Sequence, residues 1–444
     1  MTHGILIAAP RSGSGKTVVT LGLLRALANA GQSVASFKAG PDYIDPAFHA
    51  AASGKPCFNL DPWGMRVETR HGLLAAAEND AFVVVEAMMG LFDGAADGTA
   101  SAADLAVEAG LSVILVVDCA GLSHSVAALV KGYRDHRSDV ALAGVILNRV
   151  GSPRHELMLR QALNEAGIAV FGALPVLPTL ALPSRHLGLV QAGEHGGLDA
   201  FLQDAGAAIR SYVDLDALLG AGRPVRSGVR SQNAKSTLPF AVSRLAVARD
   251  EAFSFCYPHH LESWRRADIA VSFFSPLANE APDPSCEAVY LPGGYPELHG
   301  ARLAGNDVFL DGLRAAAERG HVYGECGGYM VLGDALVDAE GKRHAMAGLL
   351  PVTTSFVERR LSLGYRSVRL LSPNALFGAG VERFAAHEFH YSVVLSEDAI
   401  GGGARCLFEC RDATGKPWGD DQGQVGLQKG RVMGSYMHII DCEG

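Results

Sequence analysis

A cysteine and a histidine in the C-terminal half have the residue types and surroundings of a nucleophile and its base. Cys326 lies in the run Gly-Glu-Cys-Gly-Gly at 324–328, after a β-type lead-in and before residues compatible with a helix. The glycines two residues before and two after it permit a sharp turn, which presents the sulfur at a helix N-terminus where a thiolate is favoured. His438 follows a short predicted strand and is available as the base for Cys326. The alternatives without a catalytic role are that Cys326 is an inert buried cysteine and that His438 is an ordinary surface histidine.

Glycines in the same half offer backbone N–H groups to this nucleophile. The strand-like run at 288–291 ends in Pro-Gly-Gly at 292–294. We expect the N–H groups of Gly294 and Gly327 to form an oxyanion hole, because such donors stabilise the charge that develops during acyl transfer. His387 and His390 stand three residues apart, but they lack HExxH spacing, so we do not expect a metal there.

A phosphate-binding loop is predicted near the N-terminus. The sequence Ala-Pro-Arg-Ser-Gly-Ser-Gly-Lys-Thr at 9–17 follows a strand-like run and opens a helix. In such a loop the glycines let backbone N–H groups approach phosphate oxygens, the lysine adds positive charge and the threonine can hold Mg²⁺. The residues expected to bind ATP here are Ser12, Gly13, Gly15, Lys16 and Thr17. Pro10 replaces the first glycine of the usual motif, and the alternative is a glycine-rich turn that binds nothing.

Two acidic residues could complete a magnesium site with Thr17. Asp45 lies in a loop at 38–46 after the second predicted strand, and Glu86 ends the strand at 82–85. Acids at the carboxyl edge of parallel strands lie where ligands bind in open α/β sheets. We therefore expect Thr17, Asp45 and Glu86 to be Mg²⁺ ligands, although a lone loop carboxylate is often a cap or solvated. Asp93, in Phe-Asp-Gly, is explained equally well by a turn.

These residues must be positioned by strands and helices that alternate along the chain. The strands are expected at 5–9, 33–37, 82–85, 113–117 and 142–147, and the helices at 18–30, 126–133 and 156–166. Such alternation predicts a parallel sheet with right-handed crossovers. A second strand series is expected at 245–248, 269–274 and 288–291, and it predicts another α/β domain.

The region between the two series has the composition of a linker. Residues 223–228 and 231–236 are polar, basic and weakly periodic. We therefore predict a first domain at 1–220, a linker at 221–240 and a second domain at 241–444.

Composition excludes several classes of protein. Of 444 residues, 48% are hydrophobic and only 19% are charged, which excludes a disordered charged chain. The net charge of −9 argues against a nucleic-acid binder, because such domains are usually basic. No apolar run reaches the ~18 residues of a membrane span, and no basic leader precedes the first strand. None of the eight cysteines forms a CxxC pair, so we expect a cytoplasmic protein with reduced thiols.

Together these motifs make the chain resemble the cobyrinic or hydrogenobyrinic acid a,c-diamide synthases, a family of glutamine-dependent amidotransferases in vitamin B12 synthesis. The resemblance covers nearly the whole chain. It is carried by the phosphate loop, by the run at 38–46, by residues 85–90, 182–189, 274–277, 291–298 and 363–366, and by Cys326 and His438. The combination of Gly-Pro-Asp-Tyr-Ile-Asp-Pro at 40–46 with the cysteine turn is highly specific.

The resemblance implies a two-domain α/β fold. An N-terminal dethiobiotin-synthetase-like P-loop domain, built on a parallel sheet, would bind ATP and the corrinoid macrocycle. A C-terminal class I glutamine amidotransferase domain would hydrolyse L-glutamine through a thioester on Cys326, with His438 raising the nucleophilicity of the thiol. ATP with Mg²⁺ would convert the a and c acetate carboxylates to acyl phosphates, from which ammonia displaces phosphate.

Further residue roles come from the same resemblance. Lys38 is expected to join Lys16 in the phosphate clamp, and Asn148 resembles the family's contact to adenine. The loop expected to touch the macrocycle consists of Asp42, Tyr43, Ile44 and Asp93. Class I glutaminases commonly carry Glu two residues after the base, where this chain has Ile440. The identity of a third member of the Cys–His pair therefore stays open.

Other interpretations stay open in the sequence. A related amidotransferase, such as a cobyric acid synthase or a peptidoglycan-precursor amidase, would share many of these features. A chromosome-partitioning ATPase switch with an inert second domain would normally carry Lys at the position of Arg11, and it has no use for the cysteine turn. The metal-free macrocycle is favoured over the cobalt-containing one on overall resemblance. Oligomeric state is also open, with a homodimer among the alternatives.

Overall fold

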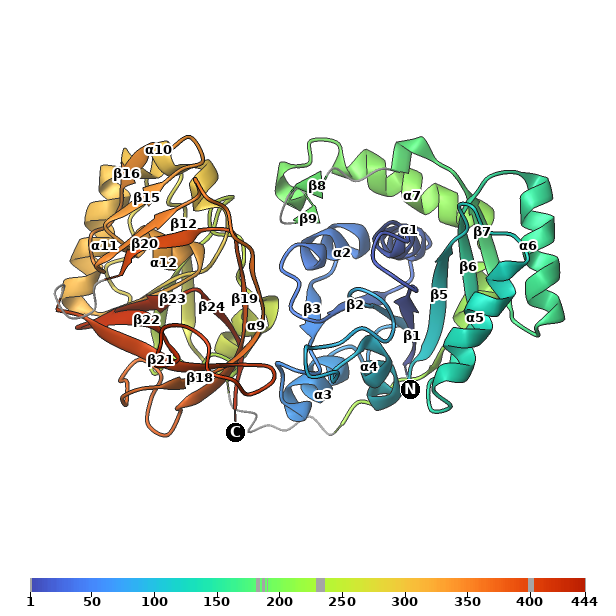
Figure 1. Ribbon diagram of the computed structural model, residues 1–444, viewed down its shortest axis with the longest axis horizontal. Helices are drawn as coiled ribbons and strands as arrows, with labels where there is room; N and C mark the ends of the chain where they lie inside the picture. The colour runs from blue at the N-terminus through green and yellow to red at the C-terminus, as the bar shows by residue number, and fades with distance from the viewer. Residues whose placement is uncertain are drawn as a thin grey trace. The chain divides into compact units, whose positions relative to one another are not determined.

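The computed structural model describes residues 2–180, 184–185, 188–189, 191–228, 236–397 and 403–443. Part of the motif at 182–189 lies outside these described residues. The chain forms two compact units, one of residues 1–63 and 67–233 and the other of residues 64–66 and 234–444 (Figure 1). Each unit has its own central sheet, so the expected pair of α/β domains is confirmed.

A parallel sheet forms the centre of the first unit. Its strands, in spatial order, are β3 (Cys57–Leu60), β2 (Val34–Ala39), β4 (Phe82–Glu86), β1 (His3–Ala8), β5 (Ser112–Asp118), β6 (Leu142–Val150) and β7 (Val170–Pro175). Neighbours in this order are parallel, and the two-residue β10 (Arg223–Pro224) pairs antiparallel with β1. The five strands expected from the apolar runs are present, with ends shifted by at most three residues.

Helices cover both faces of this sheet. One face carries α1 (Lys16–Asn29), α2 (Asp45–Ser53) and α7 (Leu198–Tyr212), and the other carries α3 (Val67–Ala75), α4 (Ala102–Ala109), α5 (Ser125–His136) and α6 (Pro153–Glu165) (Figure 1). The short α8 (Leu215–Gly220) follows α7. Strands β1, β4 and β5 are buried over almost their whole length, which explains why they are continuous apolar runs.

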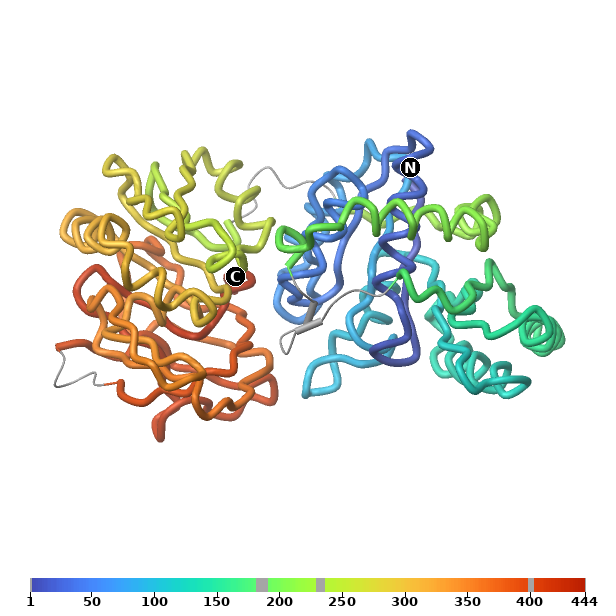
Figure 2. The backbone as a smooth tube through the Cα atoms, turned by 90° about the horizontal axis from the view of Figure 1, so that it is seen from above, coloured from blue at the N-terminus to red at the C-terminus, as the bar shows by residue number. Residues whose placement is uncertain are grey.

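Helix α1, which the phosphate loop opens, packs tightly against α7, and the two helices cross in Figure 2. Gly22 permits this approach, because a Cβ at that position would lie 2.7 Å from the carbonyl oxygen of Ala205. The packing fixes the direction of α1 and therefore the position of the loop before it.

The carboxyl ends of the strands bring the predicted residues of the first unit to one edge of the sheet. β1 ends at Ala8, directly before the phosphate loop, and β4 ends at Glu86. Lys38 on β2 lies opposite Glu86, and Asn148 on β6 lies opposite Asp118. Ligands bind at this edge in open parallel sheets.

A ten-stranded mixed sheet forms the centre of the second unit. In spatial order its strands are β12 (Ala270–Phe274), β11 (Arg244–Ala248), β13 (Ala288–Leu291), β14 (His321–Glu325), β23 (Val432–Ser435), β22 (Gln424–Lys429), β21 (Arg405–Asp412), β18 (Ser362–Leu370), β19 (Arg383–His390) and β24 (Met437–Cys442). The first five strands are parallel, and each pair from β23 onward is antiparallel. β11, β12 and β13 match the three strands expected here.

Further elements pack around the second sheet. The helices are α9 (Pro258–Arg266), α10 (Gly300–Ala304), α11 (Asp307–Arg319) and α12 (Gly327–Leu332), and a small sheet contains β16 (Arg343–Ala345), β15 (Ala335–Val337), β17 (Val352–Ser355) and β20 (Val393–Glu397). Aromatic side chains, including Trp264, Tyr290 and Tyr323, fill much of the core. In the described part of the chain, no helix is both long and apolar enough to span a membrane.

Both units extend into the region that we predicted to be a linker. The N–H of Val225 donates to the carbonyl of Thr2 at 2.9 Å, which continues the pairing of β10 with β1. Leu238 and Phe240 are buried in the core of the second unit. Ordered packing therefore occupies parts of the range 221–240 on both sides.

Candidate active sites

The phosphate loop depends on glycine at a position that no other residue fits. Gly15, directly before α1, has a φ of 92°, in the left-handed region that favours glycine. A Cβ at Gly15 would collide with Nδ2 of Asn148, which donates to the carbonyl of Ser14 at 2.9 Å. The loop backbone is therefore held in place by the end of β6, and its N–H groups are the ones expected to bind phosphate oxygens.

Replacing Gly15 by alanine is expected to raise the KM for ATP by about tenfold or more, because it adds both a left-handed strain of ~1–2 kcal/mol and the collision with Asn148. Synthesis should fall with either nitrogen donor, while glutamine hydrolysis stays near the wild-type rate. Gly31→Ala is the matched control, since Gly31 is also left-handed but a Cβ there meets nothing within 4 Å. Equal KM values for the two variants would contradict this role of Gly15.

The basic and acidic residues of the first unit meet around Glu86. The Glu86 carboxylate is fully buried and accepts hydrogen bonds from Thr17 Oγ1 at 2.8 Å and Lys38 Nζ at 3.0 Å. Its other oxygen lies 2.7 Å from Nε2 of His49. Lys38 also forms a short ion pair with Asp45. Thr17, Asp45 and Glu86 are therefore brought together, as the sequence predicted, with Lys38 between the two acids.

Burial and charge set the ionisation of this cluster. Burial alone lowers the pKa of Lys38, but the carboxylates of Asp45 and Glu86 outweigh it and raise that pKa. The pKa of Glu86 is lowered, because Lys38 and His49 overcome the effect of its burial. Burial, with the nearby carboxylate of Asp42, raises the pKa of Asp45 to about 6. Glu86 is therefore the firmly ionised acid of the pair.

The donor set fits a magnesium ion bound together with phosphate. A threonine hydroxyl and two carboxylates supply the hard oxygen ligands that Mg²⁺ prefers, and this ion usually keeps other positions for water and phosphate oxygens. The described residues contain no group of three or more His, Cys, Asp or Glu side chains arranged to hold a metal. An ion here would thus depend on Thr17 and on the nucleotide for the rest of its coordination.

Lys16 lies beside this cluster. Its Nζ donates to the carbonyl oxygen of Met89 at 2.6 Å, within the loop after β4. Burial lowers the pKa of Lys16, with Glu86 acting in the opposite direction. The ammonium group is held where the phosphate loop meets the acidic residues, as expected for a phosphate-binding lysine.

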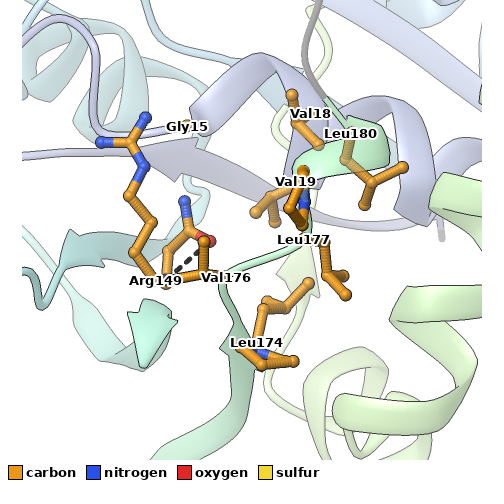
Figure 3. A pocket seen from close by; sticks show the side chains of 11 residues that line it. Gly15, Val18, Val19, Arg149, Leu174, Val176, Leu177 and Leu180 are labelled. Carbon is orange, nitrogen blue, oxygen red and sulfur yellow. Dashed lines mark hydrogen bonds between the residues drawn. The ribbon is translucent and has the colours of Figure 1, made fainter. Parts of the chain in front are cut away.

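A cavity of about 210 Å³ opens next to the phosphate loop (Figure 3). It is lined by Gly15, Val18, Val19, Asn148, Arg149, Leu174, Pro175, Val176, Leu177, Pro178 and Leu180. The walls are mainly aliphatic, and Asn148 and Arg149 supply the polar groups. Arg149 pairs with Asp118 at 2.6 Å, and its N–H donates to Oδ1 of Asn148 at 3.0 Å. Apolar walls with one amide group suit a heterocyclic base.

The predicted substrate loop contains residues with different roles. Oδ1 of Asp42 accepts the N–H groups of Ile44 and Asp45 at 2.8 and 2.9 Å, so this acid shapes the loop. Ile44 is only 8% exposed, whereas Tyr43 is half-buried. Asp93, which we placed with this loop, accepts the N–H of Gly90 at 2.8 Å and so closes a turn. Of this group, Asp42 and Tyr43 are half-buried and Asp93 is exposed, so these three residues have side-chain surface that a substrate could contact.

Cys326 lies at the sharp turn that its sequence predicted. β14 ends at Glu325 and α12 begins at Gly327, so Cys326 is the single residue between them. Its φ of 47° is unusual for a residue with a side chain and typical of a strained nucleophile turn. A Cβ at Gly328 would overlap the carbonyl of Leu291, which explains why glycine follows. The side chain is 3% exposed, and burial raises the pKa of the thiol.

Three contacts bring the cysteine turn, the glycine turn and His438 together. A Cβ on Gly327 would lie 3.1 Å from the backbone nitrogen of Gly294, which places the two expected oxyanion-hole residues side by side. A Cβ on Gly293 would overlap the ring of His438. The carboxylate of Glu325 accepts the N–H of Ile439, the residue after His438, at 3.2 Å. The predicted catalytic groups therefore converge.

The environment of His438 favours a neutral imidazole. His438 is fully buried on β24, and burial lowers its pKa, with His387 and His390 acting in the same direction. A neutral ring can accept the proton of a thiol. Phe389 contributes a carbonyl oxygen 3.9 Å from Sγ of Cys326, so β19 borders the nucleophile.

Two family models match the chain. A CobQ/CobB/MinD/ParA nucleotide binding domain matches residues 5–190, and a CobB/CobQ-like glutamine amidotransferase domain matches residues 244–442. Three similar proteins are named hydrogenobyrinate a,c-diamide synthase, and each alignment covers 99% of both chains. They come from Rhizobium meliloti (strain 1021), with 57% identity over 441 residues, Sinorhizobium sp, with 54% over 446, and Brucella abortus biovar 1 (strain 9-941), with 55% over 446. The chain belongs to this family.

Membership of the hydrogenobyrinate a,c-diamide synthase family confirms the resemblance inferred from the motifs and makes the protein a glutamine-dependent, amide-forming ligase of cobalamin biosynthesis. A family match to an amidotransferase over 244–442 argues against an ATPase switch with an inert second domain. Sequence similarity over the full length to proteins of this name also argues against the interpretations as a cobyric acid synthase or a peptidoglycan-precursor amidase.

The sequence analysis missed several residues that surround the two candidate sites of this hydrogenobyrinate a,c-diamide synthase homologue. His49 stands one helical turn after Asp45, a spacing that could have indicated a shared face of α2. In the second unit, Glu388 pairs with Arg366 at 2.7 Å and lies 3.1 Å from Nε2 of His390. The two histidines of the run at 387–390 thus belong to the surroundings of Cys326 and His438.

Proposed function

We propose that this protein amidates the a and c acetate side chains of hydrogenobyrinic acid, with ATP and L-glutamine as co-substrates, in the cytoplasm. The observation that supports the proposal is the presence in one chain of two separate clusters of reactive groups. One set surrounds Lys16 and Glu86 and can transfer phosphate, and the other surrounds Cys326 and can release ammonia. The names of the full-length relatives support the metal-free macrocycle as substrate.

The first unit activates the carboxylate. An ionised carboxylate is a poor electrophile, and attack of its oxygen on the γ-phosphorus of ATP gives an acyl phosphate and releases ADP. The loop N–H groups and Lys16 hold the phosphates, Lys38 stays protonated between Asp45 and Glu86, and Asn148 contacts the base in the adjoining cavity. Mg²⁺, held by Thr17, Asp45 and Glu86, would supply positive charge to the phosphoryl group during transfer.

The second unit releases ammonia from glutamine. His438 accepts the proton of the Cys326 thiol, and the sulfur attacks the carboxamide carbon, so that a C–S bond forms. The tetrahedral oxyanion is stabilised by the N–H groups of Gly294 and Gly327. The C–N bond then breaks, and the proton on His438 leaves with ammonia. Water hydrolyses the thioester to glutamate and restores the thiol.

Ammonia completes the reaction at the acyl phosphate. Its nitrogen attacks the acyl carbon, the bond to the phosphate oxygen breaks, and inorganic phosphate leaves with formation of the amide. Two such cycles, each using one ATP and one glutamine, amidate both acetates.

The test is to incubate the purified protein with ATP, Mg²⁺ and glutamine and with either hydrogenobyrinic acid or its cobalt-containing counterpart, and then to analyse products by mass spectrometry. We expect the diamide of the metal-free macrocycle to form with the higher kcat/KM. Faster conversion of the cobalt-containing compound would contradict the substrate assignment. Formation of four amides at other side chains would instead indicate a cobyric acid synthase.

Tyr43 is expected to influence which acetate reacts, because it is half-buried in the loop that also carries Asp45, whereas the carboxylate of Asp42 beside it is engaged in shaping that loop. Tyr43→Ala should increase the ratio of monoamide to diamide by about fivefold or more, with the KM for ATP changed by less than about twofold. Ile44→Val, at the buried neighbouring position, is the control and should leave the product ratio unchanged. An unaltered ratio with a raised KM for ATP in Tyr43→Ala would reverse the assignment.

A further inference from the structure

The outer edge of β24, the strand that carries His438, is held by side chains instead of by another strand. β24 is the last strand of the ten-stranded sheet and pairs with β19. On its other side, Nε2 of His260 lies 2.8 Å from the carbonyl oxygen of Ile439, and Nε2 of His259 lies 2.9 Å from that of Ile440. The N–H of Ile439 donates to Glu325 at 3.2 Å. The backbone N–H of Ile439 and the carbonyl groups of Ile439 and Ile440 at this edge are thus hydrogen-bonded by three buried, ionisable side chains.

Glu325 adds a side-chain link to the backbone pairing of β14 with β23, the strand that precedes β24 in the chain. β14 is the fourth strand in the spatial order and β24 is the tenth, so no ladder of backbone hydrogen bonds joins them. Glu325 is the last residue of β14 and directly precedes Cys326. Its carboxylate therefore connects the strand that ends at the nucleophile with the strand that carries the base.

The Glu325 side chain is fixed by its own surroundings. It is 1% exposed, and Tyr290 Oη donates to its second oxygen at 2.7 Å. Tyr290 is itself buried and stacks on Tyr323, with ring centroids 6.0 Å apart. The carboxylate is thus held between a tyrosine hydroxyl and the backbone of β24. A buried carboxyl group is costly to retain, which favours a specific role over simple packing.

We propose that Glu325 is a positioning residue for glutamine hydrolysis, which sets the imidazole of His438 against Cys326 by holding the N–H of Ile439. The inference rests on the proposed roles of Cys326 and His438. In this chain Ile440 occupies the position, two residues after the base, where class I glutaminases commonly carry an acid. Glu325 orients the base strand from the nucleophile's own strand. Because misplacement of reacting groups by about 1 Å costs ~10²-fold in rate, this backbone hydrogen bond bears directly on kcat.

The test compares Glu325→Leu and Glu325→Gln in the full-length protein. Leucine removes both hydrogen bonds, and we expect the glutaminase kcat to fall by about 10- to 100-fold, with the KM for glutamine changed by less than about threefold. Glutamine keeps an oxygen for the N–H of Ile439 and should restore kcat to within about threefold of wild type. Inactivation by 6-diazo-5-oxo-L-norleucine, which alkylates the nucleophile, should slow by the same factor as kcat.

Asn374→Ala is the matched control. Asn374 is buried in the same unit, and its hydrogen bonds join it to the N–H of Leu376 at 2.9 Å and to Sδ of Met433 on β23 at 3.2 Å. This variant should be less stable in thermal unfolding and keep its kcat. If Glu325→Leu does not fold, the inference is tested with Tyr290→Phe, which removes the hydroxyl that donates to Glu325. This variant should lower the glutaminase kcat by about two- to fivefold at an unchanged KM for glutamine.

Several outcomes would overturn the inference. They are a wild-type kcat in Glu325→Leu, an equal loss in Glu325→Gln and Glu325→Leu, or, where leucine does not fold, a wild-type kcat in Tyr290→Phe. Cys326→Ser, measured alongside, separates this result from a failure of the proposed function. If that variant still hydrolyses glutamine, the nucleophile itself is misassigned. If it does not, the Glu325 variants report on positioning alone.

Discussion

Replacing Cys326 by serine is expected to reduce glutamine hydrolysis and glutamine-dependent synthesis together, by about 10³-fold or more, while synthesis from ammonium salts continues near the wild-type rate. A serine hydroxyl has a far higher pKa than a thiol, and His438 has no acid two residues later to assist it. A loss of this size corresponds to about 4 kcal/mol of transition-state stabilisation. Free ammonia does not need the thioester, so the chemistry at the phosphate loop is unaffected.

The measurement is the ratio of ammonia-supported to glutamine-supported product, with ATP and Mg²⁺ present. Cys410→Ser, at another buried cysteine of the second unit, is the control and should leave the ratio unchanged. Retention of glutamine-supported synthesis in Cys326→Ser would remove this residue as the nucleophile. Loss of synthesis from both donors would mean that the thiol is also needed for activation of the carboxylate.

Replacing Glu86 by glutamine is expected to have the opposite selectivity, with synthesis lost from both donors and glutaminase activity kept. The carboxylate accepts from Thr17 and Lys38 and lies against His49, so a neutral amide removes the charge on which all these contacts depend. Loss of one charged ligand costs several kcal/mol of transition-state stabilisation, and each ~1.4 kcal/mol is tenfold in rate. We therefore expect a loss of about 10³-fold or more.

Glu108→Gln is the matched control for Glu86→Gln. Glu108, on α4, pairs with the buried Arg70 of α3 at 2.6 Å, and both helices lie on the face of the sheet opposite α1 (Figure 1). This variant should lose some thermal stability and retain synthesis. Wild-type turnover and an unchanged dependence on Mg²⁺ concentration in Glu86→Gln would exclude Glu86 from the site.

The same assays on Lys16→Ala should show loss of synthesis from both donors.

The features that sequence predicted well are those dictated by local backbone geometry. Gly15 and the glycines around Cys326 occupy conformations or contacts that a side chain would prevent, so glycine spacing carries that information in the sequence itself. The strands of the first sheet are buried on both faces and therefore appear as uninterrupted apolar runs. The second half of the antiparallel strand β18 alternates between half-buried and buried positions, and the strand gives a weaker signal.

Contacts between distant segments were not predictable in the same way. The position of Lys38 between Asp45 and Glu86 depends on strands β2 and β4 being neighbours, and the bond from Glu325 to the N–H of Ile439 spans more than a hundred residues. The role of Asp93 toward the macrocycle stays a prediction, because a carboxylate that closes a turn has the same local sequence as one that meets a ligand.

The burial of Cys326 also has a consequence for chemical damage. Peroxides and general alkylating reagents attack thiolates, and a thiol that is 3% exposed with a raised pKa offers them little thiolate and little access. We therefore expect the reactivity of Cys326 to depend on the arrival of a molecule that fits against the turn. On this expectation, Cys326 is protected from oxidation and alkylation until its substrate binds.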